Sequence, residues 1–219
     1  MERREFLKTT TLGIAAAMAV TPGFSSPTPV RPAGLKLKKS LKFDMVKEDL
    51  SILDKFKLLK DLGFDGVELE TPNTLPMKEV LEARDKTGLL IPGVVCGATW
   101  RSQLSHADPA VRAKGVELVK QSLNACKQYG GTTVLVIPGV VGAETSYGDA
   151  YKRSQEEVKK LLSEAEKTGV KIAFENVWNN FLLSPVECAR FVDEINHPMV
   201  GWYFDVGNVV RYGWPEHWI

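Results

Sequence analysis

Short apolar runs alternate with amphipathic segments along most of the chain, and this alternation constrains the fold more than any other feature of the sequence. The clearest run, residues 132–139 (TTVLVIPG), is apolar almost throughout, as expected for a strand that is buried on both faces of a parallel sheet. The segments between such runs carry apolar residues at helical spacing, for example Val158, Leu161 and Ala165. Repeated strand–helix units of this kind predict an α/β fold in which helices cover a parallel sheet.

The predicted elements follow one another in a regular order. We expect six strands, at residues 41–46, 65–70, 89–97, 132–139, 170–177 and 199–208. Asp108-Pro109 is a strong start signal for the longest helix, and Gly130 is a strong stop signal. Because no nucleotide-binding glycine motif follows a strand, we favour a closed βα-barrel over an open doubly wound sheet. Such a barrel has eight strands, so the chain is predicted to be a TIM (β/α)8-type barrel truncated after about six βα units.

The amino-terminal end differs in composition from the rest of the chain. Arg3 and Arg4 precede Phe-Leu-Lys and a weakly apolar stretch, a pattern that resembles a twin-arginine export signal. We predict a signal peptide at residues 1–19, a flexible Pro/Ser/Thr-rich spacer at residues 20–34 and the partial barrel at residues 35–219. This interpretation implies export to the periplasm. The apolar stretch is too short for a stable membrane span.

The charge balance argues against a polyanionic partner. The chain carries 28 Lys and Arg against 27 Asp and Glu, a formal net charge of +1, so it has no basic field that would attract nucleic acid. Small molecules are the expected partners, and a homo-oligomer is left open. Cys96, Cys126 and Cys188 lie in apolar contexts without metal-binding spacing, which favours buried free thiols.

Two carboxylates follow strongly apolar strands. Glu175 ends the run KIAFE and Asp205 ends the run GWYFD, one βα unit apart. Catalytic groups of βα-barrels lie at the carboxyl ends of the strands, and adjacent parallel strands are about 4.8 Å apart. Two carboxylates held this close repel each other unless a proton or a cation separates them, which indicates a shared divalent cation. Acidic residues at strand ends also serve as helix N-caps, and position alone does not decide between these interpretations.

Three motifs occur in order on these strands: FDGVEL at residues 64–69, AFENVWNNFLLSP at residues 173–185 and YFDVGNV at residues 203–209. Together they resemble the xylose isomerase-like TIM barrel superfamily of sugar isomerases and sugar-phosphate epimerases. The resemblance implies a divalent metal (Mn, Mg, Co or Zn) bound by Glu, Asp, His and Glu on the fifth to eighth strands. Glu175 and Asp205 match the first two ligands, and the other two have no counterpart in this sequence.

The resemblance also implies a reaction. The metal acidifies a C–H bond beside a sugar carbonyl, and carboxylates on opposite faces move the proton through an enediolate. We therefore predict a metal-dependent sugar or sugar-phosphate isomerase/epimerase in which Glu175 is both ligand and acid/base. The truncated chain is expected to be inactive, because half of the site is missing. The alternatives are a non-catalytic carbohydrate-binding barrel, a polyol dehydratase and an abasic-site endonuclease, and the near-neutral charge disfavours the last.

Four further residues are candidates for substrate contact. Glu68 alternates with apolar neighbours on its strand and could face the barrel interior, although a structural salt bridge fits equally well. Asn176 and Asn208 lie close after the two carboxylates, where they could bind sugar hydroxyls or simply stabilise turns. Trp178 could form an apolar wall against a sugar ring, and packing in the core or at the rim is the alternative.

Overall fold

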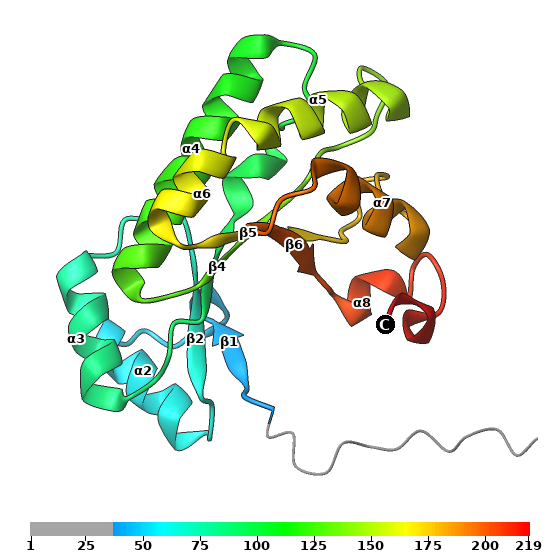
Figure 1. Cartoon of the computed structure of the whole chain (residues 1–219). Helices are drawn as coiled ribbons and strands as arrows, with labels where there is room; N and C mark the ends of the chain where they lie inside the picture. The colour runs from blue at the N-terminus through cyan, green and yellow to red at the C-terminus, as the bar shows by residue number, and fades with distance from the viewer. Residues whose placement is uncertain (1–36) are drawn as a thin grey trace, which may run out of the picture. The chain divides into compact units, whose positions relative to one another are not determined.

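A computed structural model describes residues 37–219, and the predicted signal peptide and spacer lie outside these residues, so the domain boundaries stay predictions. Six strands form one sheet in the order β1 to β6, and each neighbouring pair is parallel (Figure 1). The strands are β1 (Ser40–Lys42), β2 (Gly66–Glu70), β3 (Gly93–Cys96), β4 (Thr133–Val136), β5 (Lys171–Glu175) and β6 (Val200–Tyr203). This arrangement confirms the predicted α/β class and the strand order.

Helices connect the strands. The α-helices are α2 (Ile52–Asp61), α3 (Met77–Thr87), α4 (Pro109–Tyr129), α5 (Tyr147–Lys159), α6 (Leu162–Thr168), α7 (Pro185–Ile195) and α8 (Val206–Val209). Three 3-10 helices accompany them: η1 (Phe43–Met45), η2 (Gly97–Trp100) and η3 (Pro215–Trp218). Each parallel strand pair is therefore joined by a crossover, as a βα-repeat requires.

Local sequence signals define the ends of the longer helices. The side chain of Asp108 accepts a hydrogen bond from the Ala110 N–H at 2.8 Å at the start of α4. Gly130 ends the same helix in the left-handed conformation, at φ 82°. Ser184 caps α7 by accepting from the Glu187 N–H at 3.3 Å. The first two contacts confirm the predicted start and end of α4.

Several predicted elements differ from those observed: β3 begins at Gly93 rather than at residue 89, and β4 ends at Val136 rather than at residue 139. Strand β1 is shorter than predicted because η1 follows it directly. The single helix predicted after β4 is two helices, since the N–H groups of Lys160 and Leu161 bond to carbonyls three residues back rather than four. The sixth strand ends at Tyr203 instead of continuing to residue 208, because Asp205 caps α8 and the backbone turns into that helix.

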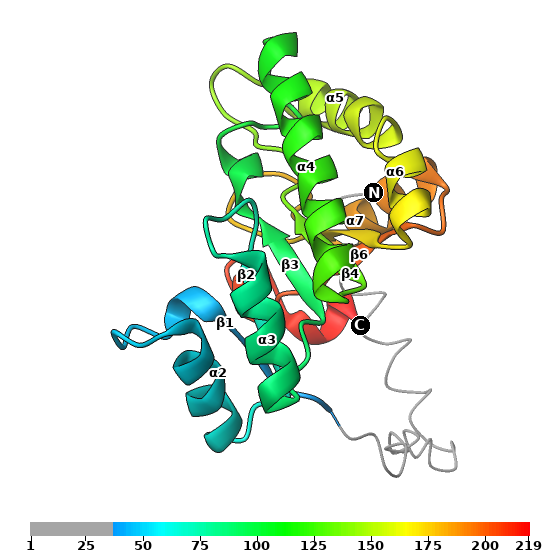
Figure 2. The ribbon, with the colours of Figure 1, turned by 90° about the vertical axis from the view of Figure 1, so that its left-hand side faces the viewer.

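The two faces of the sheet differ in chemistry. Outward side chains of the strands pack under the helices in the hydrophobic core: Val67, Leu69, Val94, Cys96, Val134, Val136, Ile172 and Phe174. Figure 2 shows α3 and α4 along this outer face. The register of the strands aligns polar side chains on the opposite face: Lys42, Glu68, Glu70, Glu175 and Tyr203. Burial of the apolar face therefore directs these polar groups to the concave side.

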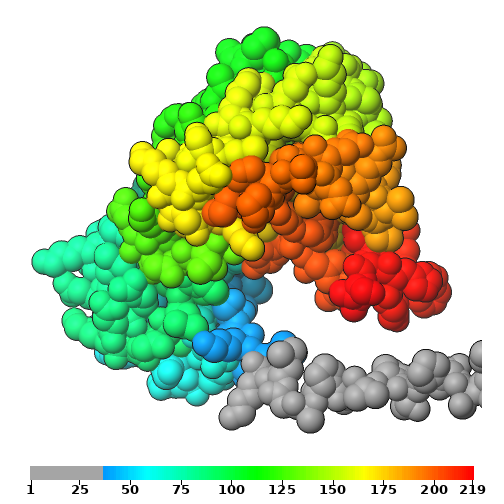
Figure 3. All heavy atoms as spheres, viewed as in Figure 1, coloured from blue at the N-terminus to red at the C-terminus, as the bar shows by residue number. Residues whose placement is uncertain are grey.

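A contact between distant strands shows that the sheet curls. The Tyr203 hydroxyl on β6 donates to Oε1 of Glu68 on β2 at 2.7 Å, although three strands lie between them. In a flat sheet, four inter-strand steps of about 4.8 Å would place these residues about 19 Å apart. The hydrogen bond thus requires barrel-like curvature, and Figure 3 shows the hollow between the N-terminal strands (blue) and the C-terminal elements (orange and red).

Two further observations concern residues 37–219. No helix in the part of the chain that the structure describes has the length and apolar composition needed to cross a bilayer. All three cysteines are buried free thiols, as predicted. Burial raises the pKa of the Cys126 thiol to about 11, so this group is unreactive at neutral pH.

Candidate active site

Glu175 and Asp205 lie at the carboxyl ends of β5 and β6 on the concave side of the sheet. Glu175 is in register with Tyr203, and Asp205 follows two residues later, so both carboxylates point to the same side. Oδ1 of Asp205 accepts the Asn208 N–H at 2.8 Å and thereby caps α8. Capping occupies one carboxylate oxygen and leaves Oδ2 for another partner. The N-cap and metal-ligand interpretations of Asp205 are therefore compatible.

The surroundings of Glu175 favour its neutral form. Burial, followed by the charge of Asp205 and a hydrogen bond shared with it, raises the pKa of Glu175 from 4.5 to about 7. Glu68 adds negative charge in the same direction, and Lys42 partly offsets it. A carboxyl group that titrates near neutrality beside a second carboxylate is suited to bind a cation or to exchange a proton.

The donor set fits part of a divalent metal site. Carboxylate oxygens are preferred ligands of hard divalent cations, and a cation between Glu175 and Asp205 would relieve their mutual repulsion. Within residues 37–219, no group of three or more His, Cys, Asp or Glu side chains is placed to hold a metal ion. The two carboxylates therefore supply only a portion of a coordination shell.

Asn176 holds the ends of β5 and β6 together. Its side chain is 1% exposed, its Nδ2 donates to the carbonyl oxygen of Asp205 at 2.7 Å, and its Oδ1 accepts the Asp205 N–H at 2.9 Å. The residue directly after Glu175 thus holds the backbone that carries the second carboxylate. Substrate contact by Asn176 stays a prediction, and the role its contacts show is the positioning of Asp205.

Glu68 and Asn208 belong to the same group of side chains. Glu68 faces the interior, as its alternation with apolar neighbours indicated, and accepts the Tyr203 hydroxyl hydrogen bond. Burial and this hydrogen bond raise the pKa of Tyr203 well above its usual value, so the phenol stays a donor. Nδ2 of Asn208 lies 3.5 Å from Oε1 of Glu175. Both residues are placed to affect Glu175, and their contact with substrate stays a prediction.

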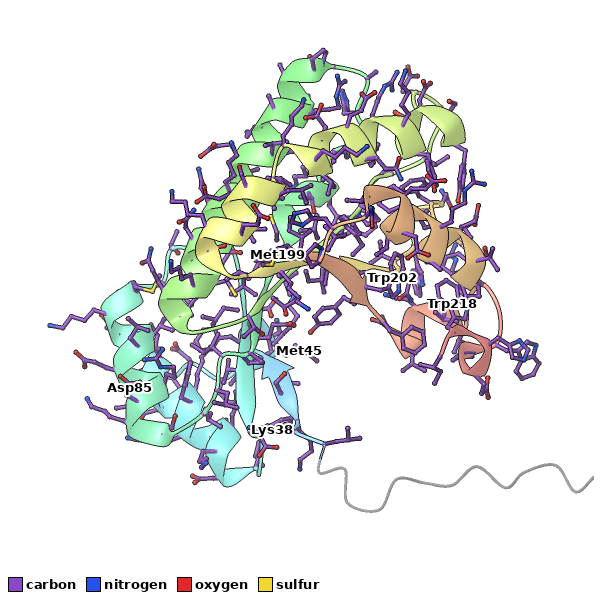
Figure 4. All side chains as sticks on the ribbon, viewed as in Figure 1. Lys38, Met45, Asp85, Met199, Trp202 and Trp218 are labelled. Atoms are coloured by element: carbon purple, nitrogen blue, oxygen red, sulfur yellow. The ribbon has the colours of Figure 1, made fainter. Side chains whose placement is uncertain are left out.

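Trp178 lies at the rim rather than in the core. It is 57% exposed, and the guanidinium of Arg211 lies 4.7 Å from its ring centroid. A separate, mostly apolar hollow of about 210 Å³ beside α7 is lined by Trp202 and Trp218 (Figure 4). The predicted packing of Trp178 against a sugar ring stays a prediction.

Sequence reasoning did not single out a larger cavity of about 580 Å³ that includes Glu70, Arg101 and Lys114 in its lining. Glu70 alternates in the same way as Glu68, and this signal could have placed it on the concave side. Arg101 and Lys114 belong to no motif, because a loop and a helix bring them together only in the folded chain.

Comparison with known proteins places the chain in a family. A sequence model of the family described as xylose isomerase-like TIM barrel matches residues 56–219, and the chain belongs to this family. L-ribulose-5-phosphate 3-epimerase of Escherichia coli (strain SMS-3-5 / SECEC) is 24% identical over 168 residues, which cover 72% of this chain and 59% of that protein. The chain thus spans about 59% of the length of this curated relative.

Solved structures share the fold. A crystal structure of D-psicose 3-epimerase in the presence of D-fructose has a TM-score of 0.69 at 18% identity and covers 80% of this chain and 65% of that one. A structure of L-ribulose 3-epimerase has a TM-score of 0.69 at 20% identity and covers 78% of this chain and 61% of that one. These likenesses confirm the barrel-type fold, while activity is a separate question.

Proposed function

We propose that this protein is a metal-dependent sugar isomerase or epimerase and that its proton-transfer chemistry uses Glu175. The observation that carries the proposal is the pair formed by Glu175 and Asp205, whose proximity and burial raise the pKa of Glu175 to about 7. The epimerases named among its relatives support the same reaction class.

Glu175 and Asp205 would hold the divalent metal, whose identity among Mn, Mg, Co and Zn the residues leave open. When bound, such a cation polarises the substrate carbonyl and makes the neighbouring C–H bond more acidic. Glu175 accepts or returns the proton at its carboxylate oxygens. Asn176 keeps Asp205 in place through the two backbone hydrogen bonds, and Tyr203 orients Glu68 on the interior side of the same site.

The test combines metal content with proton exchange. In a form of the protein that includes the two further metal ligands implied by the resemblance, we expect about one divalent ion per chain, and deuterium from D2O entering a ketose or ketose phosphate at the carbon beside its carbonyl. Glu175→Gln and Asp205→Asn should each reduce metal content, and Glu175→Gln should slow the exchange by about 100-fold or more. Glu156→Gln, which changes an exposed glutamate on α5, is the matched control and should change neither quantity.

Other outcomes separate the alternatives. A protein that binds sugar without metal and without exchange would be a carbohydrate-binding barrel. Exchange accompanied by loss of water from a cyclic polyol would identify a dehydratase. Cleavage of DNA at abasic sites would identify the endonuclease, which the near-neutral charge disfavours. Metal and exchange that survive Glu175→Gln would refute the role proposed for this residue.

A further inference from the structure

The cavity of about 580 Å³ opens where β2 and β3 end. Its walls come from Glu70 and Thr71 at the end of β2, from η2 and the residues after it, and from α4. β2 pairs with β3, and β3 packs directly against α4, as Figure 2 shows. A volume of this size accommodates a small metabolite or one end of it.

The charged side chains of this cavity that form no ion pair are positive. Arg101 and Lys114 line it, both are exposed, and neither forms an ion pair with any residue in the range 37–219. Glu70 is the one acidic residue in the lining, and its Oε2 pairs at 3.3 Å with Nζ of Lys42, which also lies 3.8 Å from Oδ2 of Asp44. Two cations therefore remain for an anionic ligand.

The lining also offers an apolar surface and a hydroxyl group. Trp100 is 42% exposed at the cavity wall, so part of its ring can contact the carbon skeleton of a ligand. Ser102 contributes a hydroxyl group beside it. An aromatic face next to two cations and a hydroxyl suits a sugar that carries a strongly acidic group.

The cavity is connected with the carboxylate site through β2. Glu70 and Glu68 project from the same face of this strand, and two residues of a strand span about 6.6 Å. Glu68 is bonded to Tyr203, which is in register with Glu175. One end of a small sugar phosphate could therefore lie in the cavity while the other end lies near the carboxylates.

We propose that this cavity binds the phosphate group of a sugar phosphate whose reacting end lies at Glu175 and Asp205. The assignment of the reacting end rests on the proposed function, whereas phosphate binding can be tested without it. The planar guanidinium of Arg101 can donate two parallel hydrogen bonds to phosphate, and Lys114 adds a compact positive charge.

The test is a titration of the purified protein with inorganic phosphate, followed by calorimetry or NMR. Arg101→Met and Lys114→Met should each weaken phosphate binding by about tenfold, because each removes a charge-assisted contact. Lys152→Met removes another exposed lysine, on α5, and should leave the affinity unchanged. Circular dichroism checks that the variants fold, as expected for substitutions of exposed side chains.

Two results would overturn the proposal. One is phosphate affinity that is unchanged in both cation variants. The other is a neutral disaccharide that binds more tightly than phosphate and depends on Trp100 but not on Arg101 or Lys114, which would make the cavity a site for a second sugar ring. Phosphate binding that depends on the two cations, together with no proton exchange in a form that has all four metal ligands, would refute the proposed function and leave the assignment of the cavity to phosphate standing.

Discussion

Replacement of Glu175 by glutamine should stabilise the metal-free protein, and only at higher pH. The pKa of Glu175 is raised from 4.5 to about 7, so the folded state binds its proton more tightly than the unfolded state. The stability that this proton contributes is present below about pH 4.5 and is lost as the pH rises to about 7. Glutamine stays neutral throughout and avoids this loss.

The size of the effect follows from the pKa. A difference of about 2.5 pH units corresponds to about 3 kcal/mol. Glu175 is only partly buried, and solvent screening reduces the expected gain to about 1 to 2 kcal/mol. Above pH 7, the variant should therefore unfold at a higher urea concentration than the unsubstituted protein. At pH 4.5 the two proteins should be nearly equal.

The assay is urea denaturation in the presence of a chelator at pH 4.5, 6 and 8, with Glu156→Gln as the control. A stability difference between Glu175→Gln and the unsubstituted protein that does not change with pH would refute the coupling argued for Glu175 and Asp205. Lower stability of the variant at pH 8 would show that the ionised carboxylate of Glu175 makes net favourable contacts in the folded protein rather than net repulsive ones.

The remaining predictions concern the support of the site and the export signal. Asn176→Ala should lower the free energy of unfolding by about 2 to 4 kcal/mol in urea titrations, because the part-buried N–H and C=O of Asp205 both lose their hydrogen-bond partner, the buried side chain of Asn176. At pH 4.5, where Glu175 carries its proton, Asp205→Asn should keep the cap on α8 and change stability by less than about 0.5 kcal/mol, whereas Asp205→Ala should cost about 1 kcal/mol. Arg3→Lys combined with Arg4→Lys should abolish export, measured as the fraction released by periplasmic extraction.

Each of these three predictions would be contradicted by a specific result. Native-like stability of Asn176→Ala would mean that water replaces the amide contacts. Equal stability of the asparagine and alanine variants at position 205 would show that the cap is unimportant. An unchanged periplasmic fraction after both arginine substitutions would refute a twin-arginine signal.

Much of the fold is predictable because its causes are local. Asp108 and Gly130 define α4 through their own side chain and backbone conformation, whatever the rest of the chain does. The apolar runs of β4 and β5 identify buried strands by composition alone. The positions of Glu175 and Asp205 follow from the same reasoning, because the carboxyl ends of all strands of a parallel sheet lie at the same edge.

The contacts of the site depend on residues that are far apart in the sequence. The amide of Asn176 reaches across to the backbone of Asp205, and only the pairing of β5 with β6 brings them together. The cavity that Arg101 and Lys114 share arises where a loop meets α4.

The sequence alone determined the alternation of strands and helices, their caps and the two carboxylates at strand ends, because each depends on neighbouring residues. Only the tertiary structure decided that the sheet curls until Tyr203 reaches Glu68, that Asp205 also caps a helix, and that two cations share a cavity. The physical reason is that hydrogen bonds and charges act over a few ångströms in space. Periodicity reports which face a residue occupies, but not which distant residue it will meet there.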